Sequence, residues 1–460
     1  MKKTILLMIV GCFFSCSKKL DIKPDSALLI PKSLVDLENL LDNTTVMNGT
    51  PGLPQISADE YYIPTLANFQ SLAIPITRTA YTWQKDIFEG KGEIFDWNQP
   101  YEQIFYCNNV LEVIAKQEFN NDAEVNRIKG WALFNRAYAF YGLVSTFSKA
   151  YDPNTANTDL GVPLKLDSDI NIIIQRSSVQ KVYDQIIKDA SEAADLLQQD
   201  IPLEKRNRPS KVAAYAFLAR VYLSMRKYDL AELYSDKELQ LYSKLTDYKT
   251  LTVKTTSSFT FNSEETIYFS FIYGNAYSQI SSSAGSLYGI DLKIIALYEP
   301  YDLRKIIYFT QNINGNYYSK GINSPNRPPF TGLATDEIYL IKAECLARKG
   351  ETALSMNFLN QLLIKRWNPN AITPSKSYQT IVANDPEDAL NKILTERMKT
   401  LIWRSLRWTD LKRLNLEGRN LVITRNLSGE IYTLEPNSPR YVMPIPDDEI
   451  SRSRLQQNIR

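Results

Sequence analysis

The chain has 460 residues, of which 44% are hydrophobic and 23% are charged, a composition typical of globular proteins. Its 53 basic and 51 acidic residues leave a formal net charge of +2. Beyond the N-terminus no stretch is basic enough to follow a phosphate backbone, which argues against nucleic-acid binding. The sequence contains no histidine. This removes the usual general base and the usual zinc ligand, so an enzyme becomes the harder hypothesis.

The N-terminus has the pattern of a signal peptide. Two lysines precede the apolar run at residues 5–10, which is too short to span a bilayer as a helix. Cysteines follow at Cys12 and Cys16, and Ser15-Cys16-Ser17-Lys18 resembles the start of surface lipoproteins. We expect residues 1–15 to be removed and Cys16 to carry lipid, with Cys12 as the alternative.

The stretch at residues 208–242 has the pattern of a helical hairpin. Tyr215, Leu218, Ala219 and Tyr222 fall on one helix face, and an alanine nine residues later opens a second apolar stripe. This spacing is the tetratricopeptide pattern, in which the small residues let the two helices approach closely. An ordinary helix pair is the alternative.

A hairpin of this kind cannot bury both faces alone, so further copies are expected. The periodicity predicts hairpins at about 124–199, 208–242, 335–367 and 385–416, besides helices near 34–41 and 101–115. Cys107 and Cys345 lie in helical patterns among apolar neighbours, which predicts buried free thiols.

Two long segments interrupt the helical pattern, at about 48–97 and 243–334. The first is rich in aromatic residues and the second in Ser, Thr, Asn and Tyr, with β-like runs at 265–272 and 306–311. Long irregular segments inside a compact domain are usually functional. The predicted fold is therefore mainly all-α: four hairpins form a scaffold that carries long loop regions and a few short strands.

Several motifs in order along the chain resemble those of one known family. They are Trp97…Tyr101-x2-Ile104…Asn108-Asn109, Asn135-Arg136-Ala137-x3-Tyr141, Gly161-Val162-Pro163-Leu164, Arg208-Pro209-Ser210-Lys211…Leu218-Ala219-Arg220-Val221-Tyr222, Asp302-x-Arg304, Asp336-Glu337-Ile338-Tyr339…Glu344, Glu396-Arg397 and Arg407-Trp408-x-Asp410-Leu411-x-Arg413. The chain resembles the SusD/RagB family of outer-membrane nutrient-binding lipoproteins over nearly its whole length.

The resemblance implies a single SusD-like domain at 16–460, without catalytic residues, cofactor or metal. It also implies a cell-surface lipoprotein of the outer membrane. Such a protein captures oligosaccharide or polysaccharide and delivers it to a TonB-dependent, SusC-like transporter. The sequence departs from the family at Lys399-Thr400 and Arg404-Ser405, which replace two acidic positions of the fourth hairpin. We expect this change to affect local packing partners more than function.

A sugar site needs flat aromatic platforms flanked by planar polar groups. Tyr81-Thr82-Trp83-Gln84 resembles the aromatic-x-Trp-Gln element with which the starch-binding family member stacks on sugar. The resemblance implies stacking by Tyr81 and Trp83 and a hydroxyl contact by Asp86, where an acid stands in place of an amide. Arg78 is a further candidate, through bidentate hydrogen bonds to adjacent hydroxyls.

The second loop region adds Tyr273, Asn275 and Tyr277 as candidate ligand-binding residues, on composition and placement alone. The alternative for each aromatic residue is a ring folded onto the core. No metal cluster is expected, and the acidic run Asp447-Asp448-Glu449 is interpreted as a solvated turn or helix start.

Three other functions stay open at this point. The same scaffold could bind peptides or other nutrients, or the chain could be a mainly structural lid of the transporter. A two-carboxylate glycosidase would need an acid and a base facing each other, for which Asp59-Glu60 and Asp86 are the loop candidates.

Overall fold

A computed structural model describes residues 31–272, 274–325, 328–368 and 377–460. The signal peptide, Cys12 and Cys16 lie outside these residues. In the part of the chain that is described, every helix is too short or too polar to cross a membrane.

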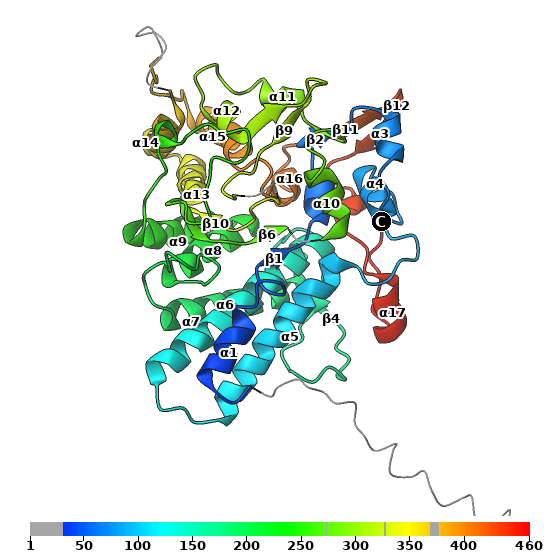
Figure 1. The fold of residues 1–460 in the computed structure, drawn as a ribbon, viewed down its shortest axis with the longest axis vertical. Coiled ribbons are helices and arrows are strands. Elements are labelled where there is room, and N and C mark those ends of the chain that lie inside the picture. The colour runs from blue at the N-terminus through cyan, green and yellow to red at the C-terminus, as the bar shows by residue number, and fades with distance from the viewer. Residues whose placement is uncertain (1–30, 273, 326–327, 369–376) are drawn as a thin grey trace, which may run out of the picture.

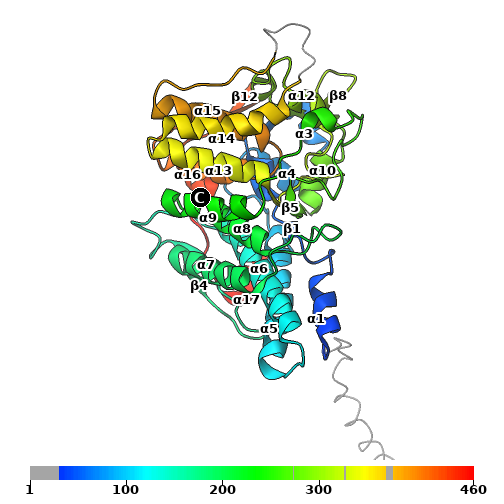
Figure 2. The same cartoon turned by 90° about the vertical axis from the view of Figure 1, so that its left-hand side faces the viewer.

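Four helix pairs form the scaffold of the molecule, and most of their helices lie along one side of it (Figures 1 and 2). They are α6 (Asp122–Phe147) with α7 (Val179–Leu196), α8 (Lys211–Ser224) with α9 (Tyr228–Leu241), α13 (Thr335–Arg348) with α14 (Thr352–Leu363), and α15 (Pro386–Thr400) with α16 (Arg407–Asn415). Helix α7 packs on α8, α9 on α13, and α13 on α15. Figure 2 shows the resulting stack, with α6 and α7 below, α8 and α9 in the middle and α13 to α15 above. The predicted helical scaffold is confirmed.

The α8–α9 hairpin shows why the sequence folds in this way. The Ser210 side chain accepts a hydrogen bond from the backbone at the start of α8 and so caps the helix. Ala219 and Ala231 are fully buried, and their small side chains allow the two helices to approach. Tyr222 of α8 stacks on Tyr234 of α9, with ring centroids 5.4 Å apart.

Buried ion pairs join the helix pairs to one another. Arg220 of α8 pairs with Glu337 of α13 at 2.6 Å, and Arg413 of α16 pairs with Glu344 of α13 at 2.6 Å. Arg404, one of the residues that depart from the family pattern, is fully buried and pairs with Asp336 at 2.8 Å. At this departure from the family pattern, the side chain is therefore held inside the scaffold by an ion pair.

The other helices surround this scaffold. They are α1 (Leu34–Leu41), α2 (Leu53–Ser57), α3 (Leu66–Gln70), α4 (Pro75–Tyr81), α5 (Phe95–Lys116), α10 (Asn275–Ser281), α11 (Leu292–Ile295), α12 (Arg304–Tyr308) and α17 (Asp447–Ser453). Helix α5 begins six residues before the predicted start and contains Pro100 in its second turn. The predicted strand at 306–311 is wrong in its first half, where α12 continues to Tyr308.

The strands form short two-stranded sheets. The pairs are β1 (Gly49–Thr50) with β6 (Phe271–Ile272), β2 (Tyr61–Tyr62) with β7 (Gly289–Ile290), β3 (Leu160–Pro163) with β4 (Arg176–Ser178), β5 (Thr266–Tyr268) with β10 (Leu333–Ala334), β8 (Phe309–Gln311) with β9 (Tyr317–Ser319), and β11 (Ile423–Leu427) with β12 (Glu430–Leu434). The β1–β6 pair is parallel and the others are antiparallel. The β1–β6 and β2–β7 pairs join the two long loop regions, which lie far apart in sequence.

Candidate functional site

The structure buries the two predicted stacking residues. Tyr81 and Trp83 are each 1% exposed. The indole nitrogen of Trp83 donates to the Ser57 carbonyl at 2.9 Å, and the Ile63 backbone N–H donates to the Tyr81 hydroxyl at 2.9 Å. Neither ring offers a face to a ligand here, so the expectation of exposed platforms at Tyr81 and Trp83 is corrected.

Both rings are buried because they enclose an arginine from a distant part of the chain. The guanidinium of Arg425 in β11 lies 3.7 Å from the ring centroid of Tyr81 and 4.6 Å from that of Trp83. It also donates to the carbonyls of Ile56 and Ala58, at 3.1 and 2.5 Å. A cation desolvated against aromatic faces is a stabilising core arrangement.

Asp86 and Arg78 do not join these rings in an open site. Asp86 is exposed, and its Oδ1 accepts hydrogen bonds from the backbone N–H groups of Phe88 (3.0 Å) and Glu89 (2.9 Å), which closes a turn. Arg78 is half-buried and donates to the Leu72 carbonyl.

The candidates in the second loop region have different outcomes. Tyr273 lies outside the described residues, and only the backbone of Asn275 is described, as the first residue of α10. Tyr277 is 3% exposed, and its ring packs 6.0 Å from that of Trp403. The prediction of Tyr277 as an accessible ligand contact is therefore corrected.

The carboxylates proposed for a glycosidase have structural partners. Asp59 forms two hydrogen bonds with Arg407, both of 2.8 Å. Glu60 is 1% exposed and accepts hydrogen bonds from Gln55 and from the backbone of Trp403. Within the described residues no group of three His, Cys, Asp or Glu side chains could hold a metal ion, and the acidic run at 447–449 begins α17.

The two loop regions nevertheless bring tyrosines and asparagines together at the surface. We call Tyr62, Asn312, Asn316 and Tyr318 the tyrosine–asparagine surface. The Tyr62 hydroxyl donates to Asn316 Oδ1 at 3.1 Å, and Asn312 Nδ2 donates to the Gly285 carbonyl at 2.7 Å. Tyr62 and Tyr318 are half-buried, so each ring is held by the fold and remains partly accessible.

Two glycines fix the positions of these rings. A Cβ atom at Gly289 would lie 2.7 Å from the Tyr62 hydroxyl, and one at Gly285 would lie 2.7 Å from Cδ1 of Tyr318. Both distances are too short for a real contact, so the rings lie where they do because the backbone beneath them has no side chain. Gly285 also has a φ of +77°, which other residues rarely adopt.

Local sequence explains how the side chains reach this surface. Side chains alternate along β2, so Tyr61 points inward and is 2% exposed while its neighbour Tyr62 points outward. Between β8 and β9, Asn312 Oδ1 accepts hydrogen bonds from the backbone of Asn314 and Asn316, each of 3.0 Å. This Asx-type turn holds the asparagines in place.

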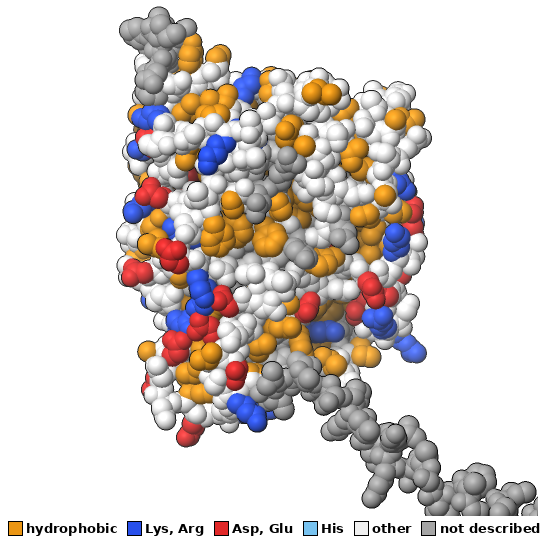
Figure 3. Space-filling view, in the orientation of Figure 1, with side chains coloured by type: hydrophobic (Ala, Val, Ile, Leu, Met, Phe, Trp, Pro, Cys, Tyr) orange, Lys and Arg blue, Asp and Glu red, His pale blue; other side chains and the backbone are white. Residues whose placement is uncertain are grey.

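The surface is suited to an uncharged, hydroxylated ligand. Partial burial raises the pKa of Tyr62, so its hydroxyl stays protonated; it donates to Asn316, and its oxygen can accept from a ligand hydroxyl. Amide groups both donate and accept hydrogen bonds. The strands that carry the surface lie in the upper part of Figure 1, and on the face shown in Figure 3 this upper part is mainly uncharged. Sequence reasoning missed these residues, although the Tyr61-Tyr62 pair and the Asn-rich turn with Gly315 were visible signals.

Comparison with known protein families gives matches over almost the whole chain. Residues 224–459 match the model described as the SusD family, and residues 18–223 match one described as starch-binding and associating with the outer membrane. No curated protein sequence matches the chain.

Solved structures of SusD-like proteins share this fold. A SusD superfamily protein from Bacteroides thetaiotaomicron is 21% identical, with a TM-score of 0.74 over 93% of this chain and 100% of the other. A SusD-like carbohydrate binding protein from Bacteroides vulgatus is 20% identical, with a TM-score of 0.69 over 92% and 97% of the two chains. A laminarin binding SusD-like protein is 17% identical, with a TM-score of 0.66 over 92% and 97%.

The helical scaffold, the loop regions joined by short sheets and the family matches agree with one another. This chain belongs to the SusD family, whose members are binding proteins rather than enzymes.

Proposed function

We propose that this protein captures glycan at the surface of the outer membrane and delivers oligosaccharide to a TonB-dependent, SusC-like transporter. The tyrosine–asparagine surface is the proposed point of glycan contact. The observation that carries this proposal is the pair of glycine-backed tyrosines, Tyr62 and Tyr318, beside asparagine amides in a member of a binding-protein family. A relative with the same fold is named for laminarin binding, which supports glycan as the ligand class.

The chemistry of this surface matches the two faces of a sugar. Aromatic faces pack against the C–H groups of a pyranose ring, and amides hydrogen-bond to hydroxyls at its rim. Side chains that come from two separate loop regions can contact several units of a glycan chain at once. We therefore expect binding to strengthen with chain length.

Affinity electrophoresis of the chain from Asp21 onwards tests the ligand class. The panel holds soluble plant, host and microbial polysaccharides, with Tyr62→Ala and Tyr318→Ala run beside the wild type. We expect one polysaccharide to retard the wild type and both substitutions to weaken the retardation at least tenfold. Tyr215→Ala is the matched control, because Tyr215 is also a half-buried tyrosine but lies on α8 in the helical stack.

The other outcomes separate the competing functions. Retardation by no polysaccharide, together with binding of oligopeptides, would favour a peptide binder. Polysaccharide binding that survives both substitutions would move the contact away from Tyr62 and Tyr318. If the protein binds no ligand but its deletion still reduces glycan uptake by the cells, the protein is a mainly structural lid of the transporter.

We also propose that Cys16 anchors the protein to the outer membrane through lipid. A Cys16→Ser variant should move from the membrane fraction to the soluble fraction, whereas Cys12→Ser should not. Co-purification of the wild type with an outer-membrane β-barrel from detergent extracts tests the proposed transporter partnership.

A further inference from the structure

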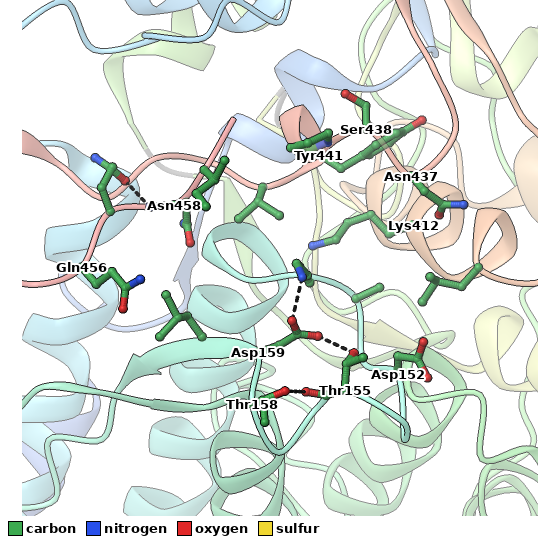
Figure 4. Close-up of a pocket in the computed structure, with 18 residues that line it drawn as sticks. Asp152, Thr155, Thr158, Asp159, Lys412, Asn437, Ser438, Tyr441, Gln456 and Asn458 are labelled. Carbon is green, nitrogen blue, oxygen red and sulfur yellow. Dashed lines mark hydrogen bonds and ion pairs between the residues drawn. The ribbon is translucent and has the colours of Figure 1, made fainter.

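A concave site lies outside the tyrosine–asparagine surface. It is a cavity of about 560 Å³ between the loop that follows α6, the C-terminal half of α16 and residues 437–459 (Figure 4). None of the four residues of the tyrosine–asparagine surface lines it. Its volume lies in the range typical of small-molecule sites.

The most unusual group in this cavity is Lys412 of α16. Its side chain is 6% exposed, and Figure 4 shows it running into the cavity with its nitrogen toward the middle. The ammonium donates to the backbone carbonyls of Ser145 and Ser148, at 2.8 and 2.7 Å. These carbonyls lie at the C-terminal end of α6, where a cation is favourable. An ammonium has three donors, so the third is left for another acceptor.

Lys412 has no carboxylate partner among the residues that the structure describes. Burial alone lowers the pKa of Lys412 to about 7, with no acidic group raising it again. A buried amine in this setting is stabilised when an anion reaches it. The ion-pairing capacity of Lys412 is therefore unused inside the chain.

The two described carboxylates that line the cavity already have cationic neighbours. Asp159 pairs with Lys149 at 2.7 Å and accepts a hydrogen bond from the Thr155 hydroxyl at 2.5 Å. Asp152 lies 3.9 Å from Arg226. Lys412 is thus the uncompensated charge of the cavity, and the charge balance favours an anion over a cation.

The rest of the lining indicates the size and character of that anion. Leu160, Leu416 and Val442 supply apolar wall, while Thr158, Ser438 and Gln456 supply hydroxyl and amide groups. Tyr441 adds an aromatic ring to the wall. A ligand with one carboxylate and several hydroxyls on a compact carbon frame uses all of these groups.

We propose that this cavity binds a sugar-sized hydroxycarboxylate, with its carboxylate on Lys412 and its hydroxyls on the Asp159, Thr155 and Ser438 side of the wall. A free uronic acid is a ligand of this class. The site is independent of the proposed glycan surface, since no residue is shared and the recognition rests on charge.

Isothermal titration calorimetry of the chain from Asp21 onwards at pH 6, where Lys412 is charged, tests the proposal. The probes are D-glucuronate, D-glucose and acetate. We expect glucuronate to bind at least tenfold more tightly than glucose, which lacks the carboxylate, and than acetate, which lacks the hydroxyls. Equal binding of acetate and glucuronate would mean an adventitious ion only and would overturn the proposal.

Two variants locate the binding. Lys412→Met should weaken glucuronate binding at least tenfold. The matched control is Lys320→Met, because Lys320 is 4% exposed and also donates to two backbone carbonyls, but lies outside the cavity. Ala150→Phe places a large side chain in the wall of the cavity and keeps Lys412, which caps the C-terminal end of α6. This variant replaces Lys412→Met in the test if Lys412→Met fails to fold.

Absence of glucuronate binding to the wild type overturns the proposal, as does full binding by a folded Ala150→Phe variant. Failure of this proposal can be told apart from failure of the proposed glycan surface, because Tyr62→Ala and Tyr318→Ala should leave glucuronate binding unchanged.

Discussion

The guanidinium of Arg425 lies 3.7 Å from the ring centroid of Tyr81, which is 1% exposed. Arg425 belongs to a hairpin near the C-terminus, whereas Tyr81 ends α4 in the first loop region. The contact holds the β11–β12 hairpin against the first loop region, so the aromatic segment at 81–83 has a structural role. Substitutions in this segment should therefore act on stability.

We predict that Trp83→Ala lowers the free energy of unfolding by about 3 to 5 kcal/mol, because it removes a fully buried ring and leaves a cavity. Urea unfolding followed by far-UV circular dichroism measures this change. Trp83→Phe keeps most of the volume but loses the hydrogen bond to Ser57, which should cost about 1 to 2 kcal/mol. A Trp83→Ala variant with wild-type stability but no glycan binding would contradict the structural role.

The two cysteines of the described chain should be inert in the folded protein. Both are buried and free, and burial raises the pKa of Cys107 to about 12 and that of Cys345 further still. Titration of the chain from Asp21 onwards with a thiol reagent should find no reactive thiol in buffer and two in 6 M guanidinium. Rapid reaction of either thiol in buffer would show that α5 or α13 opens readily.

The scaffold could be predicted from sequence because its signals are local. Helical periodicity, small residues at the helix crossings and cap residues such as Ser210 are read within about 30 residues, and each predicted hairpin corresponds to observed helices. The start of α5 was predicted too late: the helix begins at Phe95 and accommodates Pro100 about one and a half turns later.

The candidate site was not predictable in the same way, because the exposure of an aromatic ring depends on partners far along the chain. No residue near Trp83 in sequence indicates that Arg425 packs against the Trp83 ring and helps to bury it. In the same way, no residue near Tyr62 indicates that its ring lies against Gly289, which is 227 residues later in the sequence. Composition pointed to the two loop regions, and tertiary contacts decide which of their tyrosines remain accessible.

Glu60 should make stability depend on pH. Burial raises the pKa of its carboxyl to about 7, with a further rise from the neighbouring Asp59. The folded state therefore holds a proton between about pH 4.5 and 7 that the unfolded state releases. The stabilisation linked to this proton is fully present below the unfolded pKa and is lost as the pH rises to 7, by about 3 kcal/mol.

Urea unfolding of the wild type and of Glu60→Gln at pH 5 and pH 7.5 checks this dependence. The variant cannot titrate here, so the contribution of this site to the pH slope should disappear. Its stability at pH 5 should also fall, because Glu60 accepts from the Gln55 amide through one oxygen and from the Trp403 backbone through the other. Glutamine has only one oxygen, so its NH2 group would face one of these two donors. The exposed Glu118→Gln is the control and should keep the wild-type slope. An unchanged slope in Glu60→Gln would assign the pH dependence to other groups.

Removing only one partner of the Arg220–Glu337 ion pair should strongly destabilise the protein. Both side chains are buried, at 4% and 0% exposure, and their closest atoms lie 2.6 Å apart. Arg220→Met leaves the Glu337 carboxylate without its main counter-charge and should cost about 3 to 5 kcal/mol.

The double variant Arg220→Met/Glu337→Leu should recover part of this loss, since no unpaired charge remains in the scaffold. Recovery should be incomplete, because Arg220 also donates to the Tyr138 hydroxyl and to the Thr331 carbonyl, at 2.9 and 3.1 Å. A double-mutant cycle from urea unfolding measures the coupling. If the two single losses simply add in the double variant, the pair contributes no coupling, and the other contacts of Arg220 account for the effect of its substitution.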